Sequence, residues 1–421
     1  MLKKGILQQT ATDVRSYALT FVRWMLMGAV VGICGGVIGA FFSKCVAWAT
    51  TVREGNSWLL YLLPLGGLAI VGLYRLCRVS GVGTNEVFHG VRTEKGVSVL
   101  LAPAIFIGTV ITHLFGGSAG REGAALQLGG SVASLFGKIF RLSEKDKHIL
   151  TMCGMSAVFA AVFGTPMGAC VFAVEVVFVG RLLSAAWFPC MVSAVTAYGT
   201  AQFLGAHAEH FNVEMIPQFG LDTLWRVVLV AVVGALVSIL FCWVMHTGAH
   251  AFKHYFKNEF VRVVVGGAMI IVLSLVLGTN DYNGGGMHVI ERVFNEGVVN
   301  PEAFLLKMLF TSITIGAGYK GGEIVPTLFI GSTMGGTLAL LIGMDPAFGA
   351  AVGIAALFSG VTNCPVTTIL LCIELFGGEG AIFYMIAALI SFLLSGYFSL
   401  YSGQEMVFSK LGDDEVHRFG H

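Results

Sequence analysis

Apolar positions follow one another along this chain in long runs that are seldom interrupted by charge. Nine of these runs approach or exceed the roughly 20 residues that a helix needs to cross a bilayer. They cover residues 18–50, 57–76, 99–115, 149–179, 184–205, 223–253, 261–278, 347–373 and 380–400. The pattern predicts a polytopic membrane protein of the all-α class.

Three further apolar runs are shorter and bounded by glycine or proline. They cover residues 124–140, 304–316 and 324–342. Segments of this length are typical of tilted or broken helices that stop part-way across the membrane, as in many transporters. The 56 glycines agree with this prediction, because tight helix packing in lipid favours small residues and broken helices need adaptable backbone.

Composition excludes several classes of protein. Of 421 residues, 56% are hydrophobic and only 12% charged, whereas an average soluble domain has about 25% charged residues. The net charge of +1 gives no support for a nucleic-acid partner. The nine cysteines form no CxxC pair and are interpreted as small buried hydrophobes. GxxxxGK[ST], HExxH and TVGYG are missing, so we expect no enzyme, metal or cofactor.

The distribution of basic residues predicts the orientation in the membrane. Lys and Arg collect at 3–15, 75–95, 138–147 and 254–262, whereas 205–221 has none. Because cytoplasmic loops carry the excess of basic residues, we expect a cytoplasmic N-terminus and an external 205–221 loop. The first apolar run is too long for a signal peptide and is interpreted as a retained membrane helix.

Two passages recur in the second half of the chain. Phe159, Pro166 and Glu175 are matched by Phe358, Pro365 and Glu374, all 199 residues later; Gly120, Leu126 and Gly129 are matched by Gly322, Leu328 and Gly331, all 202 residues later. We therefore predict one membrane domain, 1–405, built from two inverted-topology repeats at about 20–205 and 220–405 that meet at a midplane site. Residues 406–421 are expected to form a short cytoplasmic tail. The alternative is that two Gly/Pro-rich apolar helices merely look alike.

Three glycine-rich stretches stand just ahead of helical runs. They are "SGVGTNEVFHG" (80–90), "GREGA" (120–124) and "GAGYKGGEIVPTLFIG" (316–331). Helix N-termini expose unpaired N–H groups and the positive end of the dipole, so they attract anions. Three such starts can converge on one dehydrated anion, and weak backbone donors suit a site that must also release its ion.

Charged residues among these stretches have a functional and a structural interpretation. Because ionisable residues inside membranes are costly and usually mark ion or proton pathways, Glu122 is a functional candidate. The alternative is a neighbour pair with Arg121 or a helix-capping carboxylate. Glu175 and Glu374 are interpreted as helix-end carboxylates that bond nearby backbone or a basic loop residue. His113 and Glu323 are interpreted as structural.

These motifs resemble those of the CLC family of chloride channels and anion/proton antiporters, over roughly residues 20–405. "GREGA" is similar to the family's GREGP, "GVGTNEV" (81–87) to GSGIPEI, and "GGEIVP" (321–326) to GxFxP. "FGTPMGACVFAVEV" and "LYSGQ" follow in the expected order. The resemblance implies a bacterial-type homodimer in the cell (inner) membrane, with one pore per subunit, that moves chloride or fluoride and protons.

The resemblance also implies roles for individual residues. Glu122 matches the gating glutamate, which occupies an anion site and swings away when protonated. Tyr401 matches the tyrosine whose hydroxyl points at the central anion, and the backbone amides of Ile324 and Val325 match those that coordinate it. The implied anion-binding set comprises Val82, Gly83, Thr84, Asn85, Gly120, Arg121, Gly123, Ile324, Val325 and Tyr401.

Departures from the family pattern leave the ion and its coupling open. Val82 stands where many members have a coordinating serine. The donors to the anion are therefore expected to be backbone amides, Tyr401 and either Thr84 or Asn85. Val176 stands where chloride/proton exchangers carry a second glutamate, so a passive anion channel is the alternative to exchange. The fluoride-exporting branch of the family is similar to this chain in three features: "GGEIVP", "TNCP" followed by "IELFG", and Val176. It differs from this chain at Val325 and at "GVGTN".

Overall fold

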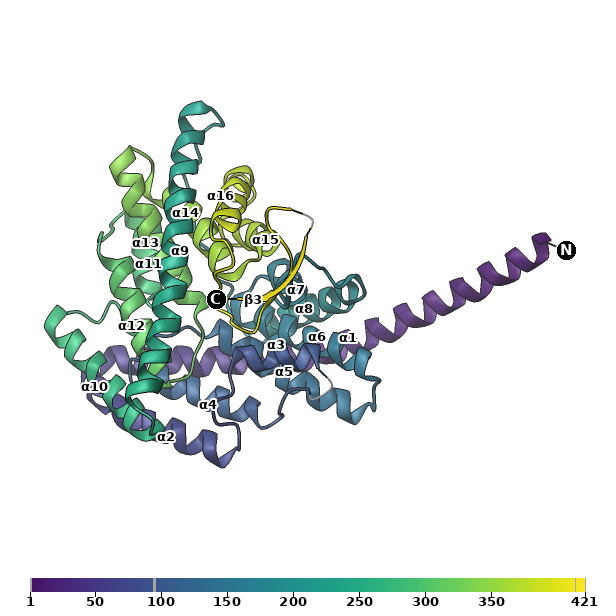
Figure 1. Cartoon of the computed structure of the whole chain (residues 1–421), viewed down its shortest axis with the longest axis horizontal. Coiled ribbons are helices and arrows are strands. Elements are labelled where there is room, and N and C mark those ends of the chain that lie inside the picture. The colour runs from purple at the N-terminus through teal and green to yellow at the C-terminus, as the bar shows by residue number, and fades with distance from the viewer. Residues whose placement is uncertain (1, 94–95, 413, 421) are drawn as a thin grey trace.

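A computed structural model describes residues 2–93, 96–412 and 414–420, with side chains from residue 14 onward. The described chain is mostly helical, and α1 extends from the packed body toward the N-terminus (Figure 1).

Helices of the first half are α1 (Leu2–Gly55), α2 (Leu63–Leu76, after the 3-10 turn Ser57–Leu62), α3 (Thr84–Arg92), α4 (Leu101–Leu114), α5 (Glu122–Ile139), α6 (Glu144–Phe163), α7 (Pro166–Glu175) and α8 (Ser184–Phe203). Those of the second half are α9 (Leu221–Tyr255), α10 (Glu259–Leu277), α11 (Met287–Glu296), α12 (Ala303–Ala317), α13 (Ile324–Ile342), α14 (Pro346–Thr362), α15 (Pro365–Phe376) and α16 (Ala381–Leu394).

Membrane-length helices are present, as the hydrophobic pattern predicts. Five helical stretches among the described residues are long and apolar enough to cross a bilayer: Val14–Gly55, Ser57–Leu76, Leu221–Tyr255, Glu259–Leu277 and Ile324–Ile342. The shorter predicted runs are also helices, because 124–140 falls on α5, 304–316 on α12 and 324–342 on α13.

Two predicted spans are wrong, because the structure breaks each of them into two helices. The run 149–179 divides into α6 and α7, and the run 347–373 divides into α14 and α15. Each break has a residue with positive φ followed two positions later by a proline: Gly164 (φ 82°) before Pro166, and Asn363 (φ 56°) before Pro365. A residue with left-handed backbone conformation ends the first helix. Proline can stand in the first turn of the next helix but cannot continue the previous one.

The short helices α7 and α15 cap each other. Glu175, at the end of α7, accepts from the Thr367 backbone N–H at 2.8 Å and from the Thr367 hydroxyl at 2.6 Å. Glu374, near the end of α15, accepts from the N–H groups of Met167 and Gly168, both at 2.8 Å. Each carboxylate thus satisfies unpaired donors at the positive end of the opposite helix. The interpretation as helix-end carboxylates is confirmed, and the reciprocity supports two related halves.

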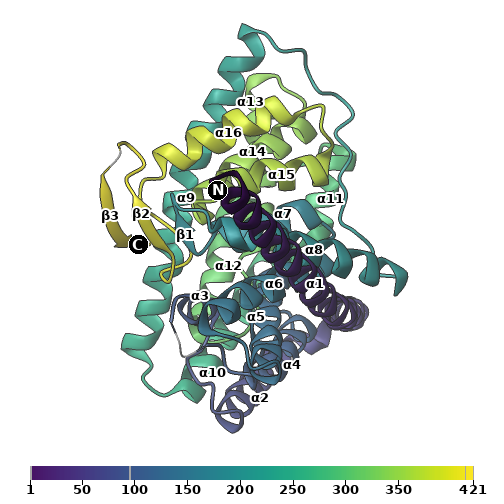
Figure 2. The same cartoon turned by 90° about the vertical axis from the view of Figure 1, so that its right-hand side faces the viewer.

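A small sheet is the part of the fold that the all-α prediction missed. The strands β1 (Phe178–Val179), β2 (Glu405–Phe408) and β3 (Glu415–Phe419) pair in this order, β1 with β2 parallel and β2 with β3 antiparallel (Figure 2). The ammonium of Lys410, in the turn between β2 and β3, donates to the Phe392 carbonyl at 2.6 Å. The described part of 406–421 is therefore paired with the helical body.

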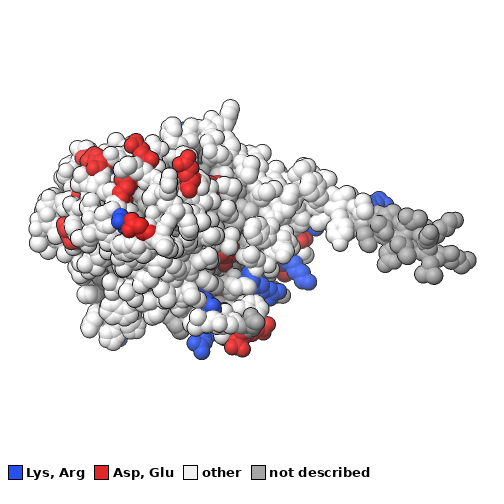
Figure 3. Space-filling view, turned by 90° about the horizontal axis from the view of Figure 1, so that it is seen from above, with Lys and Arg blue, Asp and Glu red and all other residues white. Residues whose placement is uncertain are grey.

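Charged side chains are unevenly distributed over the surface. In the view of Figure 3, most visible acidic side chains lie on the side away from the N-terminal end of α1, and most visible Lys and Arg lie toward it. This separation agrees with the orientation that the sequence predicts from its basic segments.

Close packing of α5 on α6 generates the first prediction. A Cβ added to Gly129 would lie 2.0 Å from the Gly154 carbonyl oxygen, so Gly129→Ala must push these helices apart. Such overpacking costs about 1–3 kcal/mol, and we expect a lower thermal midpoint in detergent. The matched control is Gly72→Ala, because nothing lies within 4 Å of the added Cβ in α2. Equal midpoints for the two variants would contradict the close contact.

The hairpin generates a pH prediction. A hydrogen bond at 3.1 Å and the charge of Glu405 raise the pKa of the exposed His417, with Glu415 adding to the effect. Because the pKa of His417 is higher in the folded hairpin, protonation of His417 stabilises the hairpin. This stabilisation is fully present below the pKa of the unfolded state, and it is lost as pH rises through the pKa of the folded state. We expect the β2–β3 amides to exchange hydrogen faster at about pH 8 than at about pH 5, after correction for intrinsic rates. The difference should vanish in His417→Gln; a difference that survives would contradict this ion pair.

Candidate functional site

The starts of α5 and α13 touch through the loops that precede them. The Gly120 N–H donates to the Gly322 carbonyl at 2.7 Å, and the Gly322 N–H donates back to Gly120 at 2.8 Å, which forms an isolated antiparallel bridge. A Cβ on Gly322 would lie 2.4 Å from the Gly123 nitrogen. The two loops that the repeat pairs are therefore in contact, at a distance that only glycine permits.

Glu122 is folded back onto the start of its own helix. Its side chain is 1% exposed. One carboxylate oxygen accepts the Arg121 N–H at 3.1 Å and the other accepts from Arg121 Nε at 3.3 Å. Arg121 Nη2 also pairs with Glu209, in the 205–221 loop, at 2.6 Å. The neighbour pair that the sequence left open is therefore present, and the carboxylate lies where unpaired helix donors attract an anion.

A cavity of about 300 Å³, here called the Glu122 cavity, reaches this carboxylate. Gly120, Arg121 and Val325 of the predicted set line it. His113, interpreted from sequence as structural, also lines it, and its buried Nε2 has no hydrogen-bond partner among the described residues.

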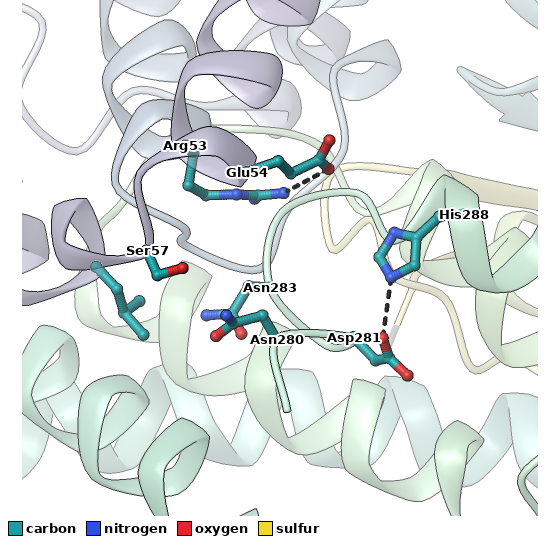
Figure 4. Close-up of a pocket in the computed structure, with 8 residues that line it drawn as sticks. Arg53, Glu54, Ser57, Asn280, Asp281, Asn283 and His288 are labelled. Carbon is teal, nitrogen blue, oxygen red and sulfur yellow. Dashed lines mark hydrogen bonds and ion pairs between the residues drawn. The ribbon is translucent and has the colours of Figure 1, made fainter. Parts of the chain in front are cut away.

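A neighbouring cavity of about 380 Å³ shares part of its lining with the Glu122 cavity. Arg53, Glu54 and His288 belong to both linings. Figure 4 shows the Arg53–Glu54 pair on one side and the His288–Asp281 pair on the other. The Glu122 cavity therefore continues into a wider polar space.

A third cavity of about 160 Å³, here called the Tyr401 cavity, is lined by five further residues of the predicted set. Its lining comprises Val82, Gly83, Thr84, Asn85, Gln127, Ile315, Tyr319, Lys320, Gly321, Glu323, Leu400 and Tyr401. Gly120 lines the Glu122 cavity, whereas Gly321 lines the Tyr401 cavity, so the bridged loops separate the two spaces. Gly123 and Ile324 line neither cavity: Gly123 packs against Gly322 between the helix starts, and Ile324 is buried.

The structure distinguishes the two polar side chains next to Val82. The Asn85 amide donates to the Ser402 hydroxyl at 2.8 Å and accepts the Gly403 N–H at 2.8 Å. It therefore ties down the segment that carries Tyr401. The Thr84 hydroxyl accepts from the Gln127 amide at 3.0 Å, and its own proton remains available to donate. Of the two, Thr84 is the better donor to an anion.

Three residues that line the Tyr401 cavity each have a buried polar atom without a hydrogen-bond partner in the described chain: the Tyr401 hydroxyl, Glu323 Oε2 and Gln127 Oε1. Because buried polar groups are normally paired, this concentration marks a place for an ion or water. Sequence reasoning missed Gln127 and interpreted Glu323 as structural. The available signal was the repeat, which places Glu323 opposite Arg121.

Within the described ranges, no metal-ligating cluster accompanies these cavities. Among the described residues, no group of three or more His, Cys, Asp or Glu is arranged to hold a metal ion. What the cavities offer is helix starts, hydroxyl donors and separate carboxylates, which suits a small anion and protons.

Comparison with known proteins identifies the family. A family model described as voltage gated chloride channel matches residues 65–396. The chain belongs to the voltage gated chloride channel (CLC) family. It is 35% identical over 396 residues to the chloride/fluoride channel protein of Pseudomonas syringae pv. tomato. The alignment covers 92% of this chain and 87% of that protein. It is 28% identical over 417 residues to the H(+)/Cl(-) exchange transporter ClcA of Vibrio vulnificus. That alignment covers 89% of this chain and 86% of the transporter.

Solved structures support the same CLC assignment. The crystal structure of a CLC-type fluoride/proton antiporter superposes with a TM-score of 0.89 at 32% identity, covering 91% of this chain and 98% of that one. A slow cyanobacterial Cl-/H+ antiporter has a TM-score of 0.76 at 22% identity, covering 89% and 94%, and supports the fold alone. The predicted family is confirmed, and the chain is a membrane protein of a family of channels and transporters.

Proposed function

We propose that this CLC protein is a homodimer in the cell (inner) membrane, in which each subunit exchanges a small halide, chloride or fluoride, for protons. The observation that carries the proposal is the Glu122 carboxylate, which is buried on a helix start and lines the Glu122 cavity. The relatives agree in kind: one is a chloride/fluoride channel protein, one an H(+)/Cl(-) exchanger, and one a fluoride/proton antiporter. We infer no enzymatic activity for the chain.

Protonation of Glu122 gives a physical route to opening. As an anion, the carboxylate is attracted by the positive end of α5 and by Arg121. A proton removes this charge, so the side chain is released and a halide takes the same donors. The tethered carboxylate and the halide thus compete for one place, which couples the movement of one to the protonation of the other.

The halide path runs from the Glu122 cavity past the glycine bridge into the Tyr401 cavity. In the second cavity, the Tyr401 and Thr84 hydroxyls are the proposed side-chain donors, together with backbone amides at the starts of α3 and α13. Asn85 ties down the segment that carries Tyr401, and the Gln127 amide donates to the Thr84 hydroxyl. Fluoride is the stronger hydrogen-bond acceptor of the two halides, and this donor set accommodates both.

The proton path needs an acceptor beyond Glu122, and Val176 provides none. The Val176 carbonyl accepts from the Gln404 amide at 3.0 Å, so this position has a structural bond. Glu323 is the alternative acceptor: its Oε2 lies 3.5 Å from the position that a Cβ on Gly123 would take. Its carboxylate therefore reaches the residue next to Glu122. The competing candidate is a passive anion channel, which the missing acid at Val176 favours.

Proteoliposomes containing the purified chain test exchange against passive conduction. An outward gradient of fluoride or chloride should drive protons uphill into the vesicles, because an exchanger must return a proton for the halide. The initial rates for the two halides, measured in one preparation, give the selectivity. Halide efflux without any proton movement would establish the passive channel instead.

Substitution of the proposed gate gives a sharper test. Glu122→Gln preserves the shape of the side chain but cannot release a proton, so we expect halide flux to lose its pH dependence and proton coupling to fall at least tenfold. The matched control is Glu144→Gln, because Glu144 is an exposed carboxylate paired with Lys147 and remote from the cavities. An unchanged pH profile in Glu122→Gln would remove this residue from the gate.

A further inference from the structure

The loop 205–221 is anchored to the second half of the chain close to Glu209. The Phe211 N–H donates to the Leu375 carbonyl, in α15, at 3.0 Å. The Phe211 ring is buried and stacks on Phe294 of α11, with a centroid distance of 4.9 Å. Because this anchor lies two residues after Glu209, it fixes the place from which the Glu209 side chain extends.

Glu209 holds the arginine that also contacts the proposed gate. Arg121 Nη2 lies 2.6 Å from Glu209 Oε1, whereas Arg121 Nε lies 3.3 Å from Glu122 Oε1. Well-formed hydrogen bonds between a cation and a carboxylate are about 2.7–2.9 Å long, so the guanidinium is bound more closely to the loop than to the gate. The Arg121 side chain is 16% exposed and that of Glu209 is 25% exposed. Two carboxylates thus share one partly buried cation.

Other charged and titratable groups line the same cavity. They are Arg53 and Glu54 from α1, His113 from α4, and His288 and Glu291 from α11. Arg53 pairs with Glu54 at 3.2 Å, and His288 pairs with Asp281 at 3.1 Å. Among the described residues, Glu209 has an ion pair with the guanidinium beside the gate and none with these groups. The charge of Glu209 therefore acts chiefly on that guanidinium.

We propose that Glu209 is a positioning residue that competes with Glu122 for Arg121 and thereby sets the pH at which the gate is released. The inference rests on the proposed function and adds a residue from outside the helix starts. The Glu209 carboxylate draws the guanidinium away from the ionised gate, and its own charge disfavours a second carboxylate nearby. Both effects make protonation of Glu122 easier, so less acid is needed to release it.

Glu209→Gln tests the competition, because it removes the charge and keeps the size of the side chain. The guanidinium of Arg121 is then attracted by Glu122 alone, so the ionised gate should persist to lower pH. In proteoliposome flux measurements, we expect the pH of half-maximal halide flux to fall by about one unit, the order expected for loss of one neighbouring charge. The flux at the acid plateau should change little.

The matched control is Glu214→Gln, which removes an exposed carboxylate of the same loop that does not line the Glu122 cavity. It should leave the pH midpoint unchanged, and an equal shift in both variants would overturn the proposal in favour of general surface charge. Glu209→Asp retains the charge and should return the midpoint toward the wild-type value. A midpoint equal to that of Glu209→Gln would assign the effect to packing instead. If Glu209→Gln does not fold, Glu209→Ala removes the same charge and carries the same expectation.

A double variant shows whether Glu209 acts through the gate. In the Glu122→Gln background no gate carboxylate titrates, so adding Glu209→Gln should leave the pH profile of flux unchanged. An effect of Glu209→Gln that persists in this background overturns the proposal, as does a midpoint in the single variant that stays in place or rises. A wild-type protein without pH-dependent halide flux would refute the proposed function itself. Normal wild-type flux with an unshifted Glu209→Gln would refute only the role of Glu209.

Discussion

The contact between Gly120 and Gly322 is the constraint on which the rest of the site depends. Two backbone hydrogen bonds, at 2.7 and 2.8 Å, join the loops before α5 and α13. This contact brings two helix N-termini, one from each half of the chain, to a single place. Because side chains larger than hydrogen would separate the loops, glycines here are a condition for the site. The two cavities, the folded-back Glu122 and the reach of Glu323 all follow from this approach.

Broken helices make that approach possible in a membrane. A helix start has unpaired N–H groups, which hydrocarbon cannot satisfy. The chain satisfies some internally, since Glu175 and Glu374 cap the short helices of the opposite halves. At α5, by contrast, the capping carboxylate is that of Glu122, on a flexible side chain that borders a cavity. The same physical need is met by a carboxylate from the opposite half at one pair of helices and by a carboxylate that borders a cavity at α5.

The described C-terminal segment connects the site to the periphery. Asn85 holds Ser402 and Gly403, and the Gln404 amide donates to the carbonyls of Val176 and Thr362 at 3.0 and 2.7 Å. Tyr401 is thus positioned by bonds to α3 and to the ends of α7 and α14. The adjoining β2–β3 hairpin then pairs with β1, directly after α7.

Local signals in the sequence determined the membrane class, the helix starts at Glu122 and Ile324, and the pairing of the two halves. Apolar length, glycine and proline act over a few residues, and a repeat is visible without a fold. The breaks before Pro166 and Pro365 also have a local signal, but the prediction relied on hydrophobic length and missed them. Only the tertiary structure decided which side chains share a cavity. Asn85 bonds the segment that carries Tyr401. Glu323 and Gln127 line the same cavity as Tyr401, and Lys320 lines both that cavity and a smaller one. These outcomes depend on contacts between distant residues, such as Asn85 and Gly403, which are 318 positions apart. No local pattern encodes such partners.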